Sequence, residues 1–159
     1  MILYPSIDLR GGRVVRLAQG DYDRETVYGD DPVAVARSFE AAGAAWVHVV
    51  DLDAARGDGP VNLAAIAAIV ASVEIPVQCG GGVVDATLLD AGVERVVMGT
   101  AAVRDPEAVE SLAVAYPGRV AVGVDHRGGD IAVRGWTEAS GVRAADLIDR
   151  FEQAGVAAF

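Results

Sequence analysis

The sequence predicts an α/β domain built on a parallel sheet, and three observations carry that prediction. Short apolar runs alternate with longer, alanine-rich amphipathic stretches along the whole chain of 159 residues. No linker or low-complexity segment interrupts this alternation. A glycine-containing motif near the N-terminus recurs in the last third of the chain. Strands that alternate with helices of this length form βαβ units, whose strands lie parallel.

Five strands and four longer helices are expected in chain order. Asp31-Pro32 and Asp105-Pro106 each combine a helix N-cap with a first-turn proline. Glycines stand just past three expected helix ends, at positions 43, 92 and 155. The predicted strands are residues 2–7, 46–50, 75–79, 95–98 and 119–124, and the predicted helices are residues 32–42, 63–72, 106–116 and 144–154.

An internal repeat organises the chain. The motif Asp8-Leu9-Arg10-Gly11-Gly12 recurs as Asp125-His126-Arg127-Gly128-Gly129, each time after an apolar strand. Each copy leads into a short β-rich segment, residues 13–17 and 131–134, which we expect to form a small hairpin arm. Residues 39–43 then recur as residues 151–155 at nearly the same offset. Two matches in the same order indicate a duplicated (βα)₄ unit.

The repeat defines the expected domain organisation. We expect a single truncated (βα)-barrel domain over residues 1–159, with a first half at 1–117 and the start of a second half at 118–159. Residues 155–159 are expected to be the turn into a sixth strand. A closed (βα)₈ barrel takes about 250 residues, so we expect a partial TIM barrel of about five βα units. The alternative is a sheet rearranged into an open Rossmann-like sandwich.

Composition excludes several classes of function. The net charge of −10 argues against nucleic-acid binding, which needs a basic surface. All 13 basic residues are arginine, which excludes Schiff-base chemistry on a lysine. We find no signal peptide and no apolar run long enough to cross a bilayer. The single cysteine, Cys79, fits a reducing compartment. We therefore expect a cytoplasmic protein with no nucleic-acid or membrane partner.

A series of motifs in fixed order resembles one known family. The motifs are Pro5-Ser6-Ile7-Asp8-Leu9, Gly20-Asp21-Tyr22, His48-Val49-Val50-Asp51-Leu52-Asp53, Gly80-Gly81-Gly82, Gly99-Thr100-Ala101-Ala102, Gly123-Val124-Asp125 and Gly135-Trp136. Together they resemble the phosphoribosylformimino-5-aminoimidazole carboxamide ribotide (ProFAR) isomerases of histidine biosynthesis, over essentially the whole chain. The resemblance implies a TIM barrel and a cofactor-free Amadori rearrangement, aminoaldose to aminoketose, of a bisphosphorylated aminoimidazole ribotide. It leaves open a dual enzyme that also isomerises phosphoribosyl anthranilate in tryptophan synthesis.

The sequence departs from the family pattern in two places. The C-terminal strands are absent, and with them the half of the site that grips the second phosphate of the substrate. The stretch 82–91 is several residues shorter than the family's third helix. Residues 85–89 therefore form barely more than one turn, at about 3.6 residues per turn. These departures lead us to expect an isomerase that is incomplete or inactive as this chain alone.

Asp8 and Asp125 are the expected catalytic residues. Each follows an apolar strand, where barrel enzymes place catalytic groups. Because side chains alternate along a strand, Asp8 shares a face with Ser6, and Asp125 with Gly123. One carboxyl would protonate the ribose ring oxygen, and the other would remove the C2′ proton. The resemblance suggests Asp8 as base and Asp125 as acid. Alternatively, each aspartate only stabilises its Arg-Gly-Gly turn.

Glycine turns after the third and fourth strands are the expected phosphate-binding sites. Gly80, Gly81 and Gly82 follow the third strand, and Gly99 and Thr100 follow the fourth. Glycine lets backbone N–H groups approach a phosphate closely, and the threonine adds a hydroxyl donor. Glycine runs after strands also occur as plain tight turns, so both interpretations stay open.

His48, Asp51 and Gly20 complete the expected substrate site. His48 lies in mid-strand, where a core or near-site histidine is favoured over a base. Asp51 is a site residue by resemblance, although it could instead cap the next segment. Cys79 is expected to be a small buried hydrophobe rather than a nucleophile. No His/Cys/Asp cluster has metal-ligand spacing, so we expect no metal and no cofactor.

Two functional hypotheses follow. The first is an isomerase that needs completion, as a two-fold homodimer or with a separately encoded C-terminal half-barrel. The second is a non-catalytic, self-associating or partner-binding barrel fragment. Both rest on the expectation that an open parallel sheet leaves two unpaired edges and one bare, apolar face.

Overall fold

The centre of the molecule is a seven-stranded sheet. The structure, a computed structural model, describes residues 2–127, 130–133 and 138–159, with the backbone alone at 126–127, 130–133 and 138–141. The strand order is β3-β2-β1-β4-β5-β6-β7. The last five strands in this order are parallel to one another, whereas β2 and β3 are added in antiparallel fashion. The chain is therefore an α/β protein with a mostly parallel sheet, as predicted.

The parallel strands and longer helices fall close to their predicted positions. The strands are β1 (Ser6–Arg10), β4 (Val47–Asp51), β5 (Val77–Gly80), β6 (Arg95–Met98) and β7 (Val120–Val122). The helices are α1 (Pro32–Ala41), α2 (Leu52–Arg56), α3 (Leu63–Ser72), α4 (Thr87–Asp90), α5 (Thr100–Arg104), α6 (Pro106–Ala115) and α7 (Ala144–Gln153). The carboxylates of Asp31 and Asp105 accept from the backbone N–H of Ala34 and Ala108, which confirms both predicted N-caps.

The first strand begins later than predicted and continues further. Residues 2–7 were expected, but β1 covers Ser6–Arg10 because it passes from the parallel sheet directly into a hairpin with β2 (Arg13–Ala18). Gly11 and Gly12 form the two-residue turn, with φ values of +55° and +77°. Positive φ at both positions is the type I′ geometry that matches the twist of a hairpin.

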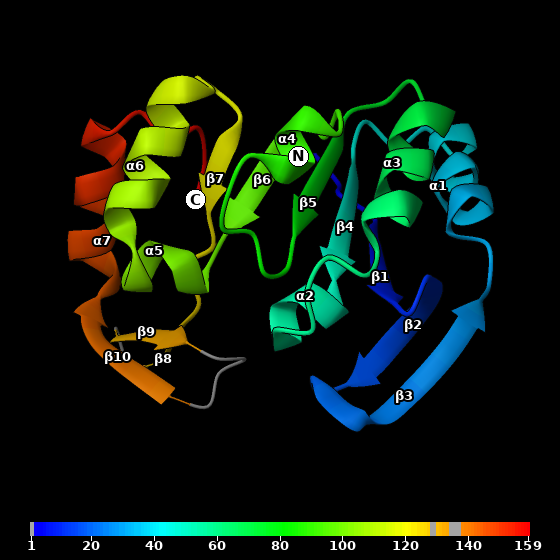
Figure 1. Cartoon of the computed structure of the whole chain (residues 1–159), viewed down its shortest axis with the longest axis horizontal. Coiled ribbons are helices and arrows are strands. Elements are labelled where there is room, and N and C mark those ends of the chain that lie inside the picture. The colour runs from blue at the N-terminus through cyan, green and yellow to red at the C-terminus, as the bar shows by residue number, and fades with distance from the viewer. Residues whose placement is uncertain (1, 128–129, 134–137) are drawn as a thin grey trace.

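The hairpin arm recurs in the second copy of the repeat, as predicted. In the first arm, Leu9 pairs with Val14 and β3 (Asp21–Gly29) adds a third strand. In the second arm, β8 (His126–Arg127) pairs with β9 (Asp130–Val133), and β10 (Glu138–Arg143) adds the third strand. The repeat residues Gly128 and Gly129, and the motif Gly135-Trp136, lie outside the described residues. Both arms lie at the end toward which the parallel strands point (Figure 1).

Three short helices depart from the sequence prediction. α2 and α5 were not predicted, because five residues that follow a strand without a linking loop carry no visible helical period. α4 was expected at residues 85–89 but begins at Thr87. The Asp85 carboxylate accepts from the Thr87 N–H, a local turn that delays the helix.

The hydrophobic core lies on one face of the sheet. Val47 and Val49 of β4 are fully buried, whereas His48 between them is only half-buried. β1 and β6 show the same alternation. The helices therefore cover one face of the parallel strands, and the other, here called the open face, stays partly accessible. The Rossmann-like sandwich, which needs helices on both faces, is not the arrangement found in the described part of the chain.

The open face is more polar than the apolar patch expected from the sequence. It presents Ser6 and Asp8 of β1, His48 of β4, Gln78 of β5 and Arg95 of β6. Polar side chains that share a face of neighbouring strands can satisfy one another. Val50 and Val97, the register partners of Asp8 and Gly80, lie on the same face, which is therefore a mixture of hydrogen-bonded polar groups and apolar side chains.

A single parallel bridge lies beside β7, near the end of the described residues. Ala158 pairs in parallel with Ala121, and the N–H groups of Val122 and Ala157 donate across this pair at 3.0 and 2.8 Å. Residues 155–159 thus lead into this bridge, and a sixth strand stays a prediction. Among the described residues, no helix has the length and hydropathy to span a membrane.

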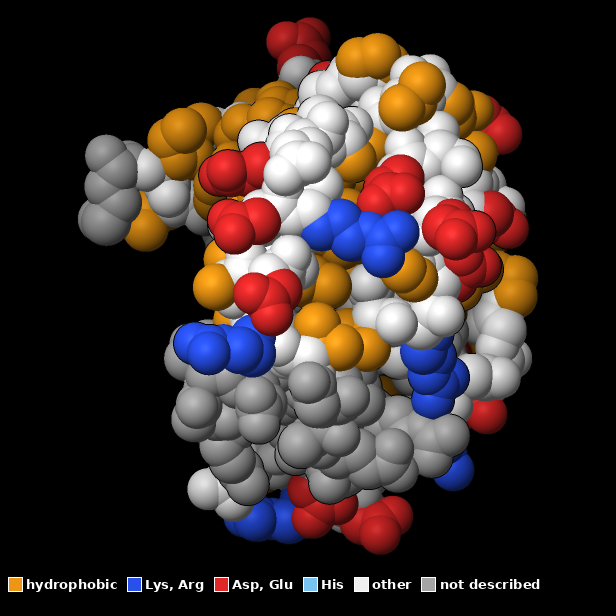
Figure 2. All heavy atoms as spheres, turned by 90° about the vertical axis from the view of Figure 1, so that its left-hand side faces the viewer, with side chains coloured by type: hydrophobic (Ala, Val, Ile, Leu, Met, Phe, Trp, Pro, Cys, Tyr) orange, Lys and Arg blue, Asp and Glu red, His pale blue; other side chains and the backbone are white. Residues whose placement is uncertain are grey.

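Helices α6 and α7 form the outer surface next to β7. The guanidinium of Arg150 on α7 donates to the carboxylate of Glu110 on α6, and this hydrogen bond lowers the pKa of Glu110. Acidic, basic and apolar side chains are intermingled over this face (Figure 2). The described part of the face therefore shows no concentration of positive charge that would attract a polyanion.

Candidate active site

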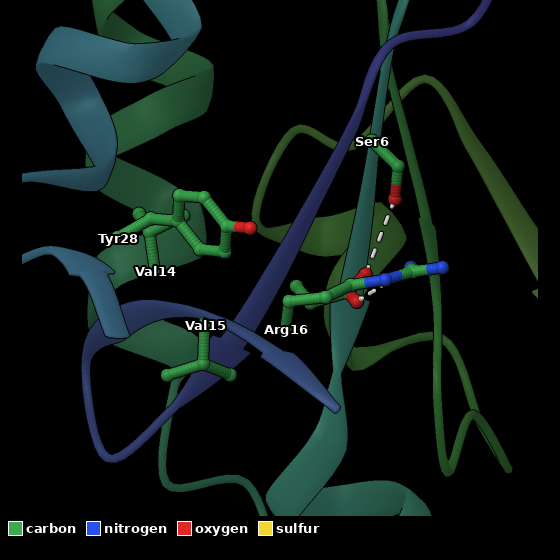
Figure 3. A pocket seen from close by; sticks show the side chains of 6 residues that line it. Ser6, Val14, Val15, Arg16 and Tyr28 are labelled. Atoms are coloured by element: carbon green, nitrogen blue, oxygen red, sulfur yellow. Dashed lines mark hydrogen bonds and ion pairs between the residues drawn. The ribbon is translucent and has the colours of Figure 1, made fainter. Parts of the chain in front are cut away.

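Asp8 lies on the open face in the middle of β1, where the strand passes from the parallel sheet into the hairpin with β2. Its carboxylate accepts from the Ser6 hydroxyl at 3.2 Å and from the Arg16 guanidinium at 3.3 Å. The side chain of Asp8 is 15% exposed, whereas that of Arg16 is 70% exposed. A cavity of about 310 Å³ opens beside them, with Tyr28 across it (Figure 3). The carboxylate is thus placed where a small molecule can reach it, and its catalytic role stays a prediction.

His48 lies on the strand next to Asp8 and on the same face. Ser6 is its register partner on β1. Burial is the main influence on the His48 imidazole and lowers its pKa, while the Asp8 carboxylate raises that pKa and Arg95 lowers it. The structure thus brings His48 within electrostatic range of Asp8, and burial favours the neutral ring.

Asp125 follows β7, three residues beyond its end, and precedes the second arm. Asp125 is exposed to solvent. Gly123 donates its N–H to the Met98 carbonyl at 3.0 Å, which extends the parallel pairing of β6 and β7 toward Asp125. Asp125 therefore occupies the same place in its copy of the repeat as Asp8 does in the first. Its catalytic role stays a prediction.

Gly80, Gly81 and Gly82 continue from β5, and two of them have a packing reason to be glycine. Gly81 and Gly82 have φ values of +93° and +64°. A Cβ atom on Gly81 would lie 2.3 Å from the Asp51 carbonyl oxygen, and one on Gly82 would lie 2.3 Å from that of Ala54. Close approach to β4 and α2 explains both glycines without a ligand, so phosphate binding there stays a prediction.

Gly99 and Thr100 follow β6 at the start of α5. Gly99 is the N-cap residue of this five-residue helix, and Thr100 is its first residue. An added Cβ atom at Gly99 would meet nothing within 4 Å. The backbone here is consequently accessible from outside, which is compatible with the predicted phosphate contact.

Asp51 belongs to a buried polar cluster rather than to the open face. It is 3% exposed, and its carboxylate caps α2 through the Ala54 N–H at 3.0 Å and accepts from the Asn62 amide at 2.7 Å. The same Asn62 amide donates to Asp53 at 2.8 Å. Because Asp51 is paired in register with Leu9, it lies on the face opposite Asp8. The structure therefore gives Asp51 the capping position.

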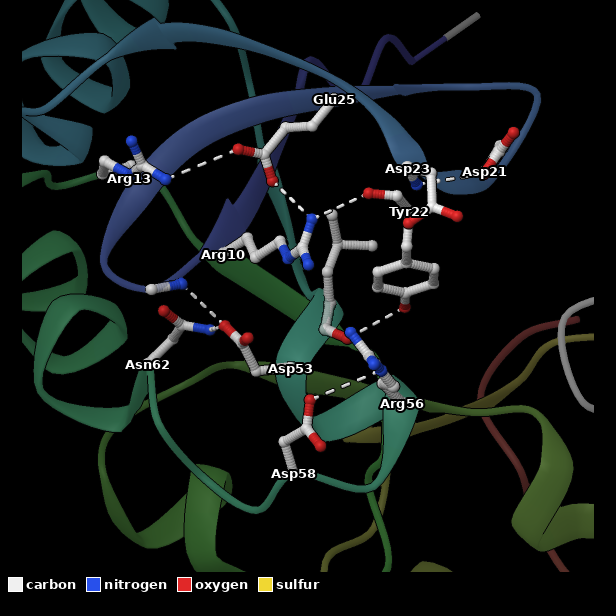
Figure 4. Close-up of polar contacts among 12 residues, drawn as sticks. Arg10, Arg13, Asp21, Tyr22, Asp23, Glu25, Asp53, Arg56, Asp58 and Asn62 are labelled. Carbon is white, nitrogen blue, oxygen red and sulfur yellow. Dashed lines mark hydrogen bonds and ion pairs between the residues drawn. The ribbon is translucent and has the colours of Figure 1, made fainter.

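This cluster also holds the first hairpin arm in place. The N–H groups of Gly11 and Gly12 donate to the side chains of Asp53 and Asn62, each at 2.7 Å. The Tyr22 hydroxyl donates to the Leu52 carbonyl at 2.9 Å (Figure 4). Sequence reasoning missed Asn62, because a single asparagine in a loop has no period and no partner spacing that marks it.

Two arginines, Arg10 and Arg56, lie close to Tyr22 of the same arm. The Arg10 guanidinium donates to Glu25 at 2.8 Å and to the Tyr22 carbonyl at 3.0 Å. Arg10 and Arg56 lie 5.3 and 5.5 Å from the centre of the Tyr22 ring, within the range of cation–π attraction. Burial raises the pKa of the Tyr22 hydroxyl against the opposing effect of these arginines. Gly20, the remaining predicted site residue, lies in the exposed turn between β2 and β3.

A second cavity, of about 350 Å³, lies outside the open face. It is bounded by Asp51 and Ala54, by four residues of the segment that follows α2, and by the stretch from Gly81 to the first turn of α4. The four residues are Gly57, Gly59, Pro60 and Leu63. The shortened stretch that the sequence showed at residues 82–91 thus forms one wall. Val84 is 67% exposed at this point.

Cys79 is a buried hydrophobe, as predicted. It is fully buried, and burial together with Asp51 raises the pKa of its thiol to about 12. A thiol in this state carries almost no thiolate at neutral pH. Among the described residues, no group of three or more His, Cys, Asp and Glu side chains is arranged to hold a metal ion.

The fold and the site together define a parallel α/β protein that carries a carboxylate and a histidine on the open face of its sheet. The chain belongs to the histidine biosynthesis protein family, whose sequence profile matches residues 2–159.

Named relatives agree with this family. A protein of Paracoccus denitrificans, called 1-(5-phosphoribosyl)-5-((5-phosphoribosylamino)methylideneamino) imidazole-4-carboxamide isomerase, is 54% identical over 162 residues, or 99% of this chain and 68% of the relative. Relatives with the same name from Dinoroseobacter shibae and Rhodospirillum rubrum are each 52% identical over 99% of this chain and over 68% and 67% of their own lengths. The predicted resemblance to the ProFAR isomerases is confirmed.

Proposed function

We propose that this chain serves the isomerisation of ProFAR, an aminoaldose-to-aminoketose rearrangement in histidine biosynthesis. The observation that carries the proposal is the identity of 54% over 99% of the chain to a protein named for this reaction. The position of Asp8 supports it, because a partly exposed carboxylate beside a cavity can reach a sugar.

The reaction needs an acid and a base, and no redox partner. Asp125 protonates the ribose ring oxygen, the C1′–O bond breaks, and the ring opens to an iminium-type intermediate. Asp8 removes the C2′ proton to give an enamine with a hydroxyl on C2′, and this enol tautomerises to the ketose. The Arg16 guanidinium and the Ser6 hydroxyl donate to the Asp8 carboxylate and hold it in position on the open face. Glycines 80–82 and Gly99-Thr100 take up a phosphate of the substrate.

The fold is the first part of a (βα)₈ barrel. The five parallel strands are the first five strands of the barrel, and Ala158 starts the sixth beside β7. The open face, with Asp8 and His48 on it, is the inner wall. The first and fifth strands lie opposite each other in an eight-stranded barrel. They carry Asp8 and Asp125, so a sugar fits between the two carboxyl groups.

Further strands close this open face. A second copy of the chain, arranged with two-fold symmetry, or a C-terminal half-barrel supplies them. Light scattering after size-exclusion chromatography tests the association: a dimer, or a complex with the supplied half-barrel, is expected. A chain that stays monomeric in both samples contradicts this part of the proposal.

Turnover of ProFAR tests the function directly. We expect activity from the chain alone or mixed with a C-terminal half-barrel. Asp8→Asn should then lower kcat by at least about 100-fold, because it removes the base. Circular dichroism should stay unchanged. Asp149→Asn on the exposed side of α7 is the matched control and should keep full activity. No turnover in either sample would count against the proposed function.

A further inference from the structure

A continuous row of polar side chains crosses four neighbouring strands on the open face. Ser6 is paired in register with His48, His48 with Gln78, and Gln78 with Arg95. Register partners of adjacent parallel strands point to the same side of the sheet. The row therefore leads from Arg95, on the fourth parallel strand, to His48 beside Asp8.

The amide of Gln78 has only one orientation that satisfies both neighbours. The Arg95 Nε–H donates to Gln78 Oε1 at 2.6 Å. A guanidinium has no acceptor, so the amide oxygen must face Arg95. The Gln78 amino group then faces His48, and Gln78 Nε2 lies 3.0 Å from His48 Nδ1. Asparagine and glutamine amides are normally ambiguous by a half-turn, and here the arginine removes that ambiguity.

The same argument fixes the tautomer of His48. An amide NH₂ is a donor only, so His48 Nδ1 must accept and carries no proton. In the neutral ring the proton is then on Nε2. Protonation of Nδ1 would place two donors against each other and break the bond to Gln78. Burial also favours the neutral ring, with Asp8 and Arg95 as the charged groups that act on it in opposite directions.

Arg95 is itself held firmly at the other end of the row. It donates to the Tyr4 hydroxyl at 2.9 Å. Its guanidinium lies 4.6 Å from the ring centre of Trp46 and 5.7 Å from that of Tyr4. These contacts limit the freedom of the arginine, so the orientation that it imposes on Gln78 is maintained.

The Nε2 edge of His48 faces the site. A Cβ atom on Gly80 would lie 3.5 Å from His48 Cε1 and 3.8 Å from Nε2. Gly80 belongs to the next row toward the carboxyl ends, together with Val50 and Asp8. Because glycine has no side chain there, this edge of the imidazole is not covered by residue 80.

We propose that Gln78 and Arg95 are positioning residues that hold His48 as the neutral Nε2–H tautomer, so that it offers a hydrogen-bond donor, and not a base, beside Asp8. Such a donor binds a hydroxyl or carbonyl oxygen of a sugar-derived substrate while Asp8 handles the proton. Its use on ProFAR rests on the proposed function; the tautomer does not.

Nitrogen NMR of the histidine rings in the full chain, without substrate and near neutral pH, tests the proposal. The chain has two histidines, so the His48 signals are assigned by comparison with His126→Gln. We expect a protonated Nε2 and an unprotonated Nδ1 in His48. Gln78→Leu removes the donor, and Arg95→Met frees the amide to turn. Each should give His48 a mixture of both tautomers.

Matched controls separate the effect of the Arg95–Gln78–His48 contacts from general effects of substitution. Gln153→Leu and Arg104→Met change exposed residues of α7 and α5 and should leave the His48 pattern as in the unmodified chain. An Nδ1–H tautomer or an imidazolium in the unmodified chain overturns the proposal, even if the variants do not fold. An unchanged pattern in both folded variants also overturns it. Absence of ProFAR turnover would contradict the proposed function alone, since the NMR pattern is measured without substrate.

Discussion

The two faces of the parallel strands differ in the side chains that they carry and in the role of those side chains. On the helix-covered face, Ile7, Val49 and Val96 are fully buried and belong to one hydrophobic core. On the open face, the residues between them include Asp8 and His48, which are hydrogen-bonded and partly accessible. Side-chain alternation along a strand therefore separates stability from chemistry within single elements. Substitutions on the first face should cost stability, and those on the second should leave it nearly intact.

The largest loss of stability is expected on the helix-covered side. Phe151 of α7 is fully buried among core residues. Phe151→Ala should lower the free energy of unfolding by about 3–5 kcal/mol, because it removes buried contacts and leaves a cavity. Urea titration measures this. Val114→Ala, at a 72% exposed position on α6, is the control and should change it by less than about 0.5 kcal/mol. Equal effects of the two substitutions would contradict a core centred on this face.

The second-largest loss of stability is expected in the buried polar cluster of Asp51, Asp53 and Asn62. Asn62→Leu removes the acceptor of Gly12 and a donor to both Asp51 and Asp53. The carboxylate of Asp51 would stay buried with fewer partners, so we expect a loss of about 2–4 kcal/mol. Asp58→Ala, at an exposed position in the same region, serves as control in the same urea titration. A loss in Asn62→Leu no larger than in that control would show that the cluster is not a source of stability.

A substitution at the open face should have a small effect on stability. Arg16→Ala removes an ion pair with Asp8 in which the arginine is 70% exposed. Exposed pairs contribute less than about 1 kcal/mol. Arg13→Ala is the matched control, because it breaks an ion pair of the same arm that does not involve Asp8. If Arg16→Ala lowered the free energy of unfolding as much as Asn62→Leu, the open face would contribute to stability as well, and the contrast between the two faces would be wrong.

The smallest effect on the free energy of unfolding is expected from the protonation of His48. Burial lowers the pKa of this imidazole in the folded chain. Between that lowered value and the ordinary value of about 6.5, the unfolded state binds more protons than the folded state. The free energy of unfolding should therefore fall as the pH is lowered through about 6.5. His48→Gln should show a weaker fall in urea titrations at several pH values. A variant with the same pH dependence as the parent would show that His48 is not the source.

Local signals in the sequence predicted most of the fold. Asp31-Pro32 and Asp105-Pro106 are complete capping signals, and the start of each helix follows from them. The repeat predicted a second arm because hairpin geometry depends on neighbouring residues. α2 and α5 escaped prediction, because the packing of a short helix against a strand end decides its formation. Tertiary context overrides local preference there.

The candidate site was predicted only in part. Asp8 and His48 were found from strand position and motif. Gln78 and Arg95 could have been found by extending the same alternation to the third and fourth strands, since both are polar residues in apolar runs. Asn62 could not, because its role depends on three segments that meet only in the folded chain.

The contact of Gly81 and Gly82 with the backbone of β4 and α2 also decides how alanine scanning of this protein can be interpreted. A methyl group at Gly81 would push the loop away from β4, and one at Gly82 would push it away from α2, so lost activity there reports a displaced loop whether or not a phosphate binds. Gly99 has free space around it and an ordinary φ of −98°, and the extra methyl group fits. Among these three glycines, Gly99 is the position where a loss of substrate affinity can be attributed to the ligand itself.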